Sequence, residues 1–239
     1  MGKLLGGILT AVGMLLWYYG GTGGITTLVN LGLGAIVLGL VVAALPLGGQ
    51  VDRNVLPLVC TPSCEFFGSI QRDLELEGEP VIIPPYENLP RGAVFLPKAK
   101  DFSIHLGRFD EGSVLVAGSE RESGVLINPP SGWEIVSYTL ENVGELAGTG
   151  VGYASSAVSS VLSALGLGSA EVFEREDGRI EVFVRPLCEG PVYADPVSSA
   201  VLLGVAIGAG ELMKVSSVEQ RKDHVKIVLE RLGGVEQWL

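Results

Sequence analysis

Few residues in this sequence have types and spacings that could support chemistry. Cys60 and Cys64 are separated by three residues in CTPSC, and Cys188 stands alone. Zinc ribbons and redox pairs use C-x2-C, so this spacing favours a turn with two ordinary thiols or a local disulfide. The two histidines, His105 and His224, lie far apart in strand-like runs, which is typical of surface or core residues rather than metal ligands.

Paired carboxylates and a glycine-rich stretch are the remaining candidates. Three acidic pairs lie in predicted turns or hairpins, where solvated surface is the usual explanation: Asp110–Glu111, Glu120–Glu122 and Glu174–Glu176. Gly148, Gly150 and Gly152 could cradle a phosphate, but no lysine follows them and a helix rather than a strand precedes them. No Walker A, G-x-S-x-G or H-E-x-x-H motif is present. We therefore expect no cofactor and no metal, and an enzyme is the minor hypothesis.

The charged residues are divided sharply between two regions. The first 50 residues contain one charged side chain, Lys3, and 13 of the 34 glycines. All 27 acidic residues and 15 of the 16 basic ones follow, so residues 51–239 carry a net charge of −12. Nucleic acid selects basic patches, which argues against it as a partner of this chain.

Two uncharged, apolar runs, Leu4 to Tyr19 and Ile25 to Leu47, make up most of the first region. A membrane-spanning helix needs about 20 apolar residues, which the second run supplies and the first only approaches. A cleaved signal peptide is the alternative for the first run, but GGTGG offers no small-x-small cleavage site. Residues 1–50 are therefore predicted to form a transmembrane helical hairpin.

The orientation of this hairpin follows from its flanking basic residues. Lys3 flanks one end and Arg53 the other, whereas the connection YYGGTGG contains none. Basic residues favour the cytoplasmic side, so we expect a two-pass protein of the cell membrane. Residues 4–47 would contact the lipid bilayer, and a soluble domain, residues 51–239, would lie in the cytoplasm, with which the odd number of cysteines is compatible.

Residues 51–130 are predicted to form an irregular β-rich segment, because short β-like runs alternate there with turn signals. These runs are Val81–Ile83, Ala93–Leu96, Phe102–Leu106, Ser113–Ala117 and Gly124–Ile127. The pairs Pro84-Pro85 and Pro129-Pro130 end two of them, since proline cannot donate a backbone hydrogen bond.

Residues 131–239 are predicted to be an α+β domain. A first helix should begin after Pro130, since Ser131 and Glu134 have the capping-box spacing. Two further helices are each followed by a β-hairpin, which suggests an internal repeat. The simplest assembly has four antiparallel strands with two helices on one face. A third membrane span over Leu146 to Ala170 is a less favoured alternative, because this run contains six serines.

The limits of the repeated unit are marked by turn and capping residues. Asp177-Gly178 is a strong hairpin signal in the first copy. In the second copy Asp195 is a good N-cap, Pro196 suits the first helical position, and Gly210 ends the helix.

Small residues recur every four positions along three of the predicted helices. The positions are Ala35, Gly39 and Ala43; Ser156, Ser160 and Ala164; and Ala200, Gly204 and Gly208. Such ridges let helix backbones approach closely, so we expect helix-packing or oligomer faces here, with Gly204 and Ser160 at a close crossing. The first ridge has an alternative, which is packing on Leu4 to Tyr19 within one hairpin.

Three segments, IPPYENLPRGAVFLP, INPPSGWEI and YADPVSSAVLLGVAIG, resemble an archaeal family of membrane-anchored α+β proteins of unknown function. The segments cover 40 of the 189 residues from 51 to 239, and none is a catalytic motif. The resemblance implies an archaeal source and a membrane address, and no activity is attached to it. Several relatives carry a cysteine where this chain has Ser198, so a thiol role at that position does not transfer.

Two functions of different class follow from these features. The first is a membrane-anchored structural or assembly protein whose acidic domain mediates contacts in a homo-oligomer or with another membrane protein. The second is a membrane-tethered ligand-binding or sensor module, with a site between the β-rich segment and the repeated unit. The acidity of the chain would favour cations or basic partners for such a site.

Overall fold

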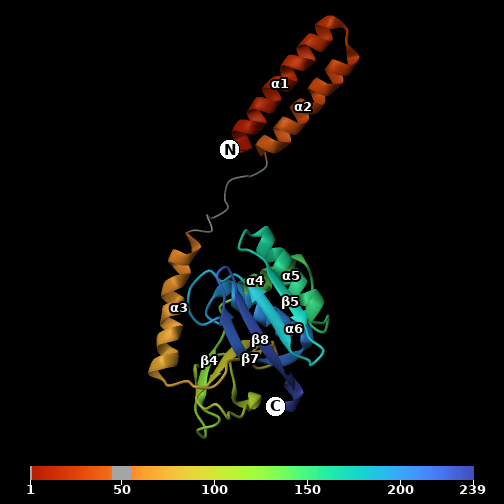
Figure 1. Cartoon of the computed structure of the whole chain (residues 1–239). Helices are drawn as coiled ribbons and strands as arrows, with labels where there is room; N and C mark the ends of the chain where they lie inside the picture. Colours follow the sequence, from red (N-terminus) through yellow and green to blue (C-terminus); the bar gives the residue numbers. More distant parts are fainter. Residues whose placement is uncertain (1, 45–54) are drawn as a thin grey trace. The chain divides into compact units, whose positions relative to one another are not determined.

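The computed structural model describes residues 2–44 and 55–239. The chain divides into two compact units, Met1–Val51 and Asp52–Leu239, and each is described by itself (Figure 1). The first unit is a helical hairpin, in which α1 (Gly2–Gly23) and α2 (Thr26–Ala44) lie antiparallel. Gly24 turns the chain between them in the left-handed conformation, φ +65°, which glycine adopts without strain.

No helix in the described part of the chain is long and apolar enough to cross a membrane. This finding contradicts the predicted transmembrane hairpin and the two-pass location in the cell membrane that was derived from it. Seven of the 22 residues of α1 are glycine, and its last turns carry Trp17, Tyr18 and Tyr19. Residues 45–54, which include the end of the predicted second span, lie outside the described residues.

The second unit is α+β. Its helices are α3 (Leu56–Asp73), α4 (Trp133–Asn142), α5 (Val151–Ala164) and α6 (Pro196–Ala209). Its strands are β1 (Val81–Ile83), β2 (Ala93–Pro97), β3 (Leu115–Val116), β4 (Gly124–Ile127), β5 (Ala170–Glu174), β6 (Ile180–Val184), β7 (Glu211–Gln220) and β8 (Val225–Gly234). They form one antiparallel sheet in the order β3-β4-β2-β1-β7-β8-β6-β5. Two short 3-10 helices, η1 (Leu106–Arg108) and η2 (Val235–Gln237), complete the unit.

This sheet is larger than the predicted four strands, because β1 pairs with β7. Val81 and Ile82 lie opposite Lys214 and Met213, and this contact joins the β-rich segment to the strands that follow α6. On its other side β7 pairs with β8, and β8 pairs in turn with β6. This pairing joins the hairpin β7–β8 to the hairpin β5–β6. Helix α5 precedes one hairpin and helix α6 the other.

Helix α6 lies at the centre of the larger core. Each of its residues from Val197 to Gly208 is buried, among the inward side chains of β6 and β8 and those of α5. On β6, for example, Ile180, Val182 and Val184 are buried while the residues between them are half-buried. A second core lies on the other face of β1, β2 and β4, where Phe95 packs on Phe109.

The ends of α6 and α4 test the capping predictions. The carboxylate of Asp195 accepts a hydrogen bond from Ser198 N–H, and Gly210 takes a left-handed conformation at the C-cap, so both predictions for α6 are confirmed. Helix α4 begins at Trp133 with Gly132 as N-cap and no side-chain hydrogen bond, so the predicted capping box does not form. The run from Leu146 to Ala170 holds the 14-residue helix α5, a turn and the first residue of β5 rather than a span.

The predicted β-rich segment begins with a helix that the sequence analysis missed. Helix α3 is 18 residues long and contains Pro62 in its interior. The strands predicted at Val81–Ile83 and Gly124–Ile127 are confirmed. The strand predicted at Phe102–Leu106 is absent there, where the chain is a loop that ends in η1.

Candidate functional site

The two helices of the hairpin touch along a seam of glycines. The buried residues between positions 6 and 42 are Gly6, Gly13, Gly20, Gly32 and Gly39. They recur every seven residues along each helix, which keeps them on one stripe facing the other helix. A Cβ atom on Gly32 would lie 2.5 Å from the backbone nitrogen of Trp17, and one on Gly13 would lie 2.7 Å from that of Ile36. Both distances are shorter than real Cβ contacts, so the seam requires glycine.

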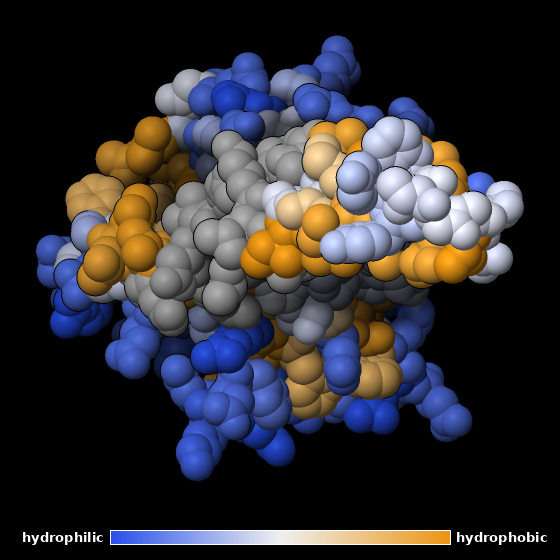
Figure 2. Space-filling model, turned by 90° about the horizontal axis from the view of Figure 1, so that it is seen from above, coloured by the Kyte–Doolittle hydropathy of each residue, from blue (hydrophilic) through white to orange (hydrophobic). Residues whose placement is uncertain are grey.

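The outer surface of the hairpin is apolar as a consequence. With glycine on the inside, the large side chains point outward, and Val37, Leu38 and Leu40 on α2 are each more than half exposed. The exposed apolar residues of the hairpin are Ile8, Val12, Met14, Leu15, Trp17, Tyr18, Tyr19, Ile25, Leu31, Leu33, Val37, Leu38, Leu40 and Val41. In Figure 2 this surface is orange to pale, and residues 4–50 contain no charged side chain. We call this set the outer apolar surface.

The predicted small-residue ridge of α2 is only partly in the seam. Gly39 faces α1, where a Cβ atom would overlap Thr10 and lie 2.9 Å from the Gly6 carbonyl oxygen. Ala35 is half-buried beside the seam, and the side chain of Ala43 lies outside the described residues. The seven-residue recurrence of glycine in both helices was the signal that would have identified the seam.

In the second unit, α5 and α6 approach closely, but not at Ser160. A Cβ atom on Gly204 would lie 2.7 Å from a methyl group of Val158, and one on Gly208 would overlap Ala154. The predicted residues Ser156, Ser160 and Ala164 instead lie exposed on another side of α5. Their four-residue spacing is real, but Ala154 and Val158 have the same spacing and are the buried residues.

Ala200 is part of a different contact, with the residue that precedes α4. A Cβ atom on Gly132 would overlap the backbone of Ala200, so only glycine fits at this position. Gly132 N–H also donates a hydrogen bond of 3.1 Å to the hydroxyl of Ser199, and both groups are buried. The segments INPPSGWEI and YADPVSSAVLLGVAIG therefore pack on each other.

Asp195, the buried N-cap of α6, also holds the loop that precedes the helix. One carboxylate oxygen accepts hydrogen bonds from the N–H groups of Leu187, at 2.6 Å, and Cys188, at 3.2 Å. The other accepts the Ser198 N–H at 2.7 Å. Three backbone donors satisfy a carboxylate whose residue is only 1% exposed, so its role is structural.

Cys60 and Cys64 form neither the two free thiols nor the local disulfide that the sequence favours. Cys64 on α3 is bonded to Cys188, so the disulfide joins α3 to the loop before α6 across 124 residues of chain. Cys60 is the free cysteine in the described part of the protein. Burial, and then the charge of Asp195, raise the pKa of the Cys60 thiol above its usual range. A raised pKa disfavours the thiolate, so Cys60 is a poor nucleophile at neutral pH.

The other residues that could support chemistry are far apart from one another. His105 faces Glu122 at 3.4 Å, and His224 packs against the ring of Phe183 with centroids 5.8 Å apart. The Gly150 N–H donates to the carbonyl of Gly208, so the glycine loop closes on α6 rather than presenting this amide to a ligand. Within residues 2–44 and 55–239, no group of three or more His, Cys, Asp or Glu side chains could hold a metal ion.

Among several cavities in the second unit, two lie beside elements discussed above. A groove of about 710 Å³ runs between α5 and β5 and is lined by five serines, including Ser156 and Ser160. A smaller cavity of about 280 Å³ lies among Pro84 and Pro85 of the β-rich segment, Trp133 of α4 and Ile207 of α6.

No family model, no curated protein and no solved structure matches the chain. The archaeal resemblance therefore stays an expectation.

Proposed function

We propose that this protein is a structural or assembly protein, and that copies of the chain associate through the outer apolar surface of the hairpin. The observation that carries the proposal is that the buried residues among positions 6–42 are glycines, while the large apolar side chains face outward. Soluble monomers rarely expose contiguous apolar patches larger than a few hundred Å². A surface of this kind marks a contact with another molecule.

The chemistry of this surface favours a second copy as the partner. It carries no charged side chain, so it offers no ionic contact that would select a charged partner, whereas the outer surface of another hairpin is equally apolar. Identical surfaces can pair around a symmetry axis and bury each other. In this proposal the second unit, in which a helix followed by a β-hairpin recurs, is the acidic domain that each copy adds to the oligomer.

The test compares the mass of the full chain, measured by analytical ultracentrifugation, with that of two matched variants. Val37→Glu places a charge on the outer apolar surface, and Val114→Glu makes the same change at a similarly exposed valine of the second unit. We expect a defined oligomer that Val37→Glu shifts toward single copies and that Val114→Glu leaves unchanged. Single copies at every concentration, or single copies bound to phosphatidylcholine vesicles, would contradict the proposal.

A ligand-binding role is the second candidate, and the 280 Å³ cavity favours it. The hypothesis puts a site between the β-rich segment and the repeated unit, and this cavity is lined by Pro84 and Pro85 of the former and by Ile207 of the latter; the rest of its lining is mainly apolar and includes Glu145. A metabolite that raises the melting temperature of the wild-type chain, but not of an Ala147→Trp variant with a filled rim, would support this role. Equal stabilisation of both proteins would count against it.

A further inference from the structure

Strand β5 forms one edge of the eight-stranded sheet. It pairs with β6 on one side, whereas the opposite edge is β3, which has only two residues. An edge strand presents backbone N–H and C=O groups that a further strand can use. With five residues, β5 is long enough to accept one.

The register of the β5–β6 hairpin shows which backbone groups of β5 point away from β6. Arg175 N–H donates to the carbonyl of Arg179 at 2.8 Å, so position 175 faces β6. Orientation alternates along an antiparallel strand, and positions 170, 172 and 174 therefore face outward. Ser159 of α5 supports this assignment, because its hydroxyl exchanges hydrogen bonds of 2.9 and 3.0 Å with the C=O and N–H of Ala170. Val172 and Glu174 supply the outward groups beyond that contact.

The space beside this edge can hold a strand. The groove of about 710 Å³ is lined on one side by β5 and on the other by the serine face of α5. Serines 155, 156, 159, 160 and 163 have short side chains with hydroxyl groups, so the groove is open and can form hydrogen bonds. A bulky face on α5 would have covered the edge.

We propose that β5 of one chain pairs antiparallel with β5 of a second copy, around a two-fold axis that passes beside Phe173. This surface is separate from the hairpin, and the inference does not depend on the hairpin's role. It joins two eight-stranded sheets into one continuous sheet. Each chain contributes the same residues, as a two-fold contact requires.

Hydrogen bonding selects the register. Outward groups must face outward groups, which leaves five symmetric alignments, centred on residues 170 to 174. The alignments centred on residues 170, 171 and 172 all need the backbone of Ala170, which Ser159 already occupies. One centred on Glu174 places two like charges opposite each other, which is destabilising. The alignment centred on Phe173 pairs Val172 with Glu174 of the second copy in both directions and avoids both problems.

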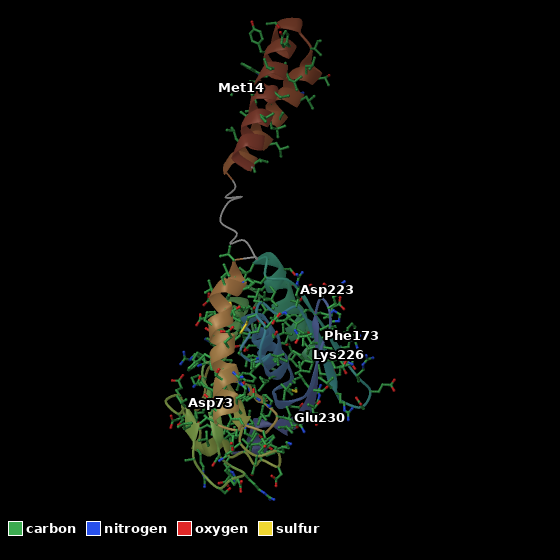
Figure 3. The ribbon with its side chains drawn as sticks, turned by 60° about the vertical axis from the view of Figure 1, so that its left-hand side comes forward. Met14, Asp73, Phe173, Asp223, Lys226 and Glu230 are labelled. Atoms are coloured by element: carbon green, nitrogen blue, oxygen red, sulfur yellow. A yellow bond between two sulfur atoms is a disulfide. The ribbon has the colours of Figure 1, made fainter. Side chains whose placement is uncertain are left out.

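The side chains on the Phe173 face complement themselves in this register. The two Phe173 rings lie opposite each other, and Phe173 is 47% exposed at the edge of the sheet (Figure 3). Glu171 of each chain lies opposite Arg175 of the other, and the Arg175 side chain is 56% exposed although it also pairs with Glu181. Aromatic and opposite-charge pairs are the cross-strand contacts that stabilise antiparallel strands.

Crosslinking of the full chain tests the inference. In a Cys60→Ser background, Phe173→Cys places two thiols opposite each other across the axis. Val218→Cys is the matched control, because Val218 is also 47% exposed and lies away from β5, on β7 opposite Ile227 of β8. On mild oxidation we expect a disulfide-linked dimer of Phe173→Cys on a non-reducing gel, at about tenfold the yield of the control.

Charge exchange then identifies the register. Glu171→Arg or Arg175→Glu alone should lower the dimer yield several-fold, because each places like charges opposite each other. The double variant should restore the yield, and this pattern is independent of any contact made by the hairpin. Equal yields at positions 173 and 218, or a double variant no better than either single one, would overturn the inference. Unchanged melting temperatures of the variants would show that each is folded.

Discussion

The two units of this protein bury their residues in opposite ways. In the hairpin, glycine lies inside and the large apolar side chains face outward. In the second unit, large side chains such as Tyr193, Phe95 and Leu202 are inside, and the charged residues lie outside. The contrast shows that a close backbone contact alone leaves the large apolar side chains exposed, whereas the sheet and helices of the second unit enclose two cores of large apolar side chains.

Glycine serves the helix contacts of both units, but with different consequences. In the hairpin, Gly13 and Gly32 make the contact on which the packing of α1 against α2 depends, because the buried residues among positions 6–42 are all glycines of the seam. In the second unit, Gly204 and Gly208 make one contact within a core that α6 shares with six of the eight strands. Loss of a single glycine should therefore disrupt the hairpin more completely than it disrupts the second unit.

The largest expected effect comes from removing the disulfide, which should lower the stability of the second unit and leave that of the hairpin unchanged. Replacing Cys64 and Cys188 with alanine should lower the free energy of unfolding of the second unit by about 2–5 kcal/mol, because the disulfide closes a long loop. The hairpin contains no cysteine, so its amide protection should not change. Hydrogen exchange with mass spectrometry reports both regions in one experiment. Cys60→Ser is the control and should leave both unchanged.

A second change breaks the hairpin alone. Gly32→Leu places a side chain where a Cβ atom already lies 2.5 Å from Trp17, and overpacking of this kind costs about 1–3 kcal/mol or more. Gly34→Leu is the control on the same helix, since a Cβ atom there meets nothing within 4 Å. Amide exchange in α1 and α2 should accelerate for Gly32→Leu only. If both variants exchange alike, the glycine seam does not hold the helices together.

Much of the second unit could be predicted from local sequence signals. Asp195, Pro196 and Gly210 marked the ends of α6, and Asp177-Gly178 marked the turn between β5 and β6. These signals act through neighbouring backbone groups, so they do not depend on the rest of the fold. The strands Val81–Ile83 and Gly124–Ile127 were likewise found from their apolar runs.

The features that were missed depend on residues far apart in sequence. The disulfide joins positions 124 residues apart, and the pairing of β1 with β7 joins segments more than 120 residues apart. Helix α3 was obscured by Pro62, which lies in its interior and argues against a helix when read locally. Ser156 and Ala154 lie on ridges of equal spacing, and only the position of α6 decides that the second one is buried.

A third change tests the glycine contact inside the larger core. Gly208→Ala should lower the melting temperature of the second unit, at a cost of about 1–3 kcal/mol, because the new methyl group would overlap Ala154. Gly152→Ala is the control in α5, where a Cβ atom has open space and alanine favours the helix. The second unit should still fold in both variants. Loss of the fold in Gly208→Ala would mean that the two units depend on glycine to the same degree.

The smallest effect concerns Cys60, whose environment differs from that of an exposed thiol. Burial and the charge of Asp195 raise the pKa of this thiol in the folded state. The unfolded chain therefore loses the proton at a lower pH than the folded chain does, and stability falls as the pH rises above the pKa of the unfolded thiol. Unfolding midpoints measured from pH 7 to 10 should therefore decline less steeply for Cys60→Ser than for the wild-type chain.

Alkylation by iodoacetamide measures the same shift directly. The rate at Cys60 in the folded chain should rise at a higher pH than the rate in urea-unfolded chain, because only the thiolate reacts. The Cys64–Cys188 disulfide leaves Cys60 as the thiol that reacts, so no other cysteine contributes to the rate. If both rates follow the same pH curve, the thiol of Cys60 is as solvated in the folded chain as in the unfolded one, and the raised pKa is wrong.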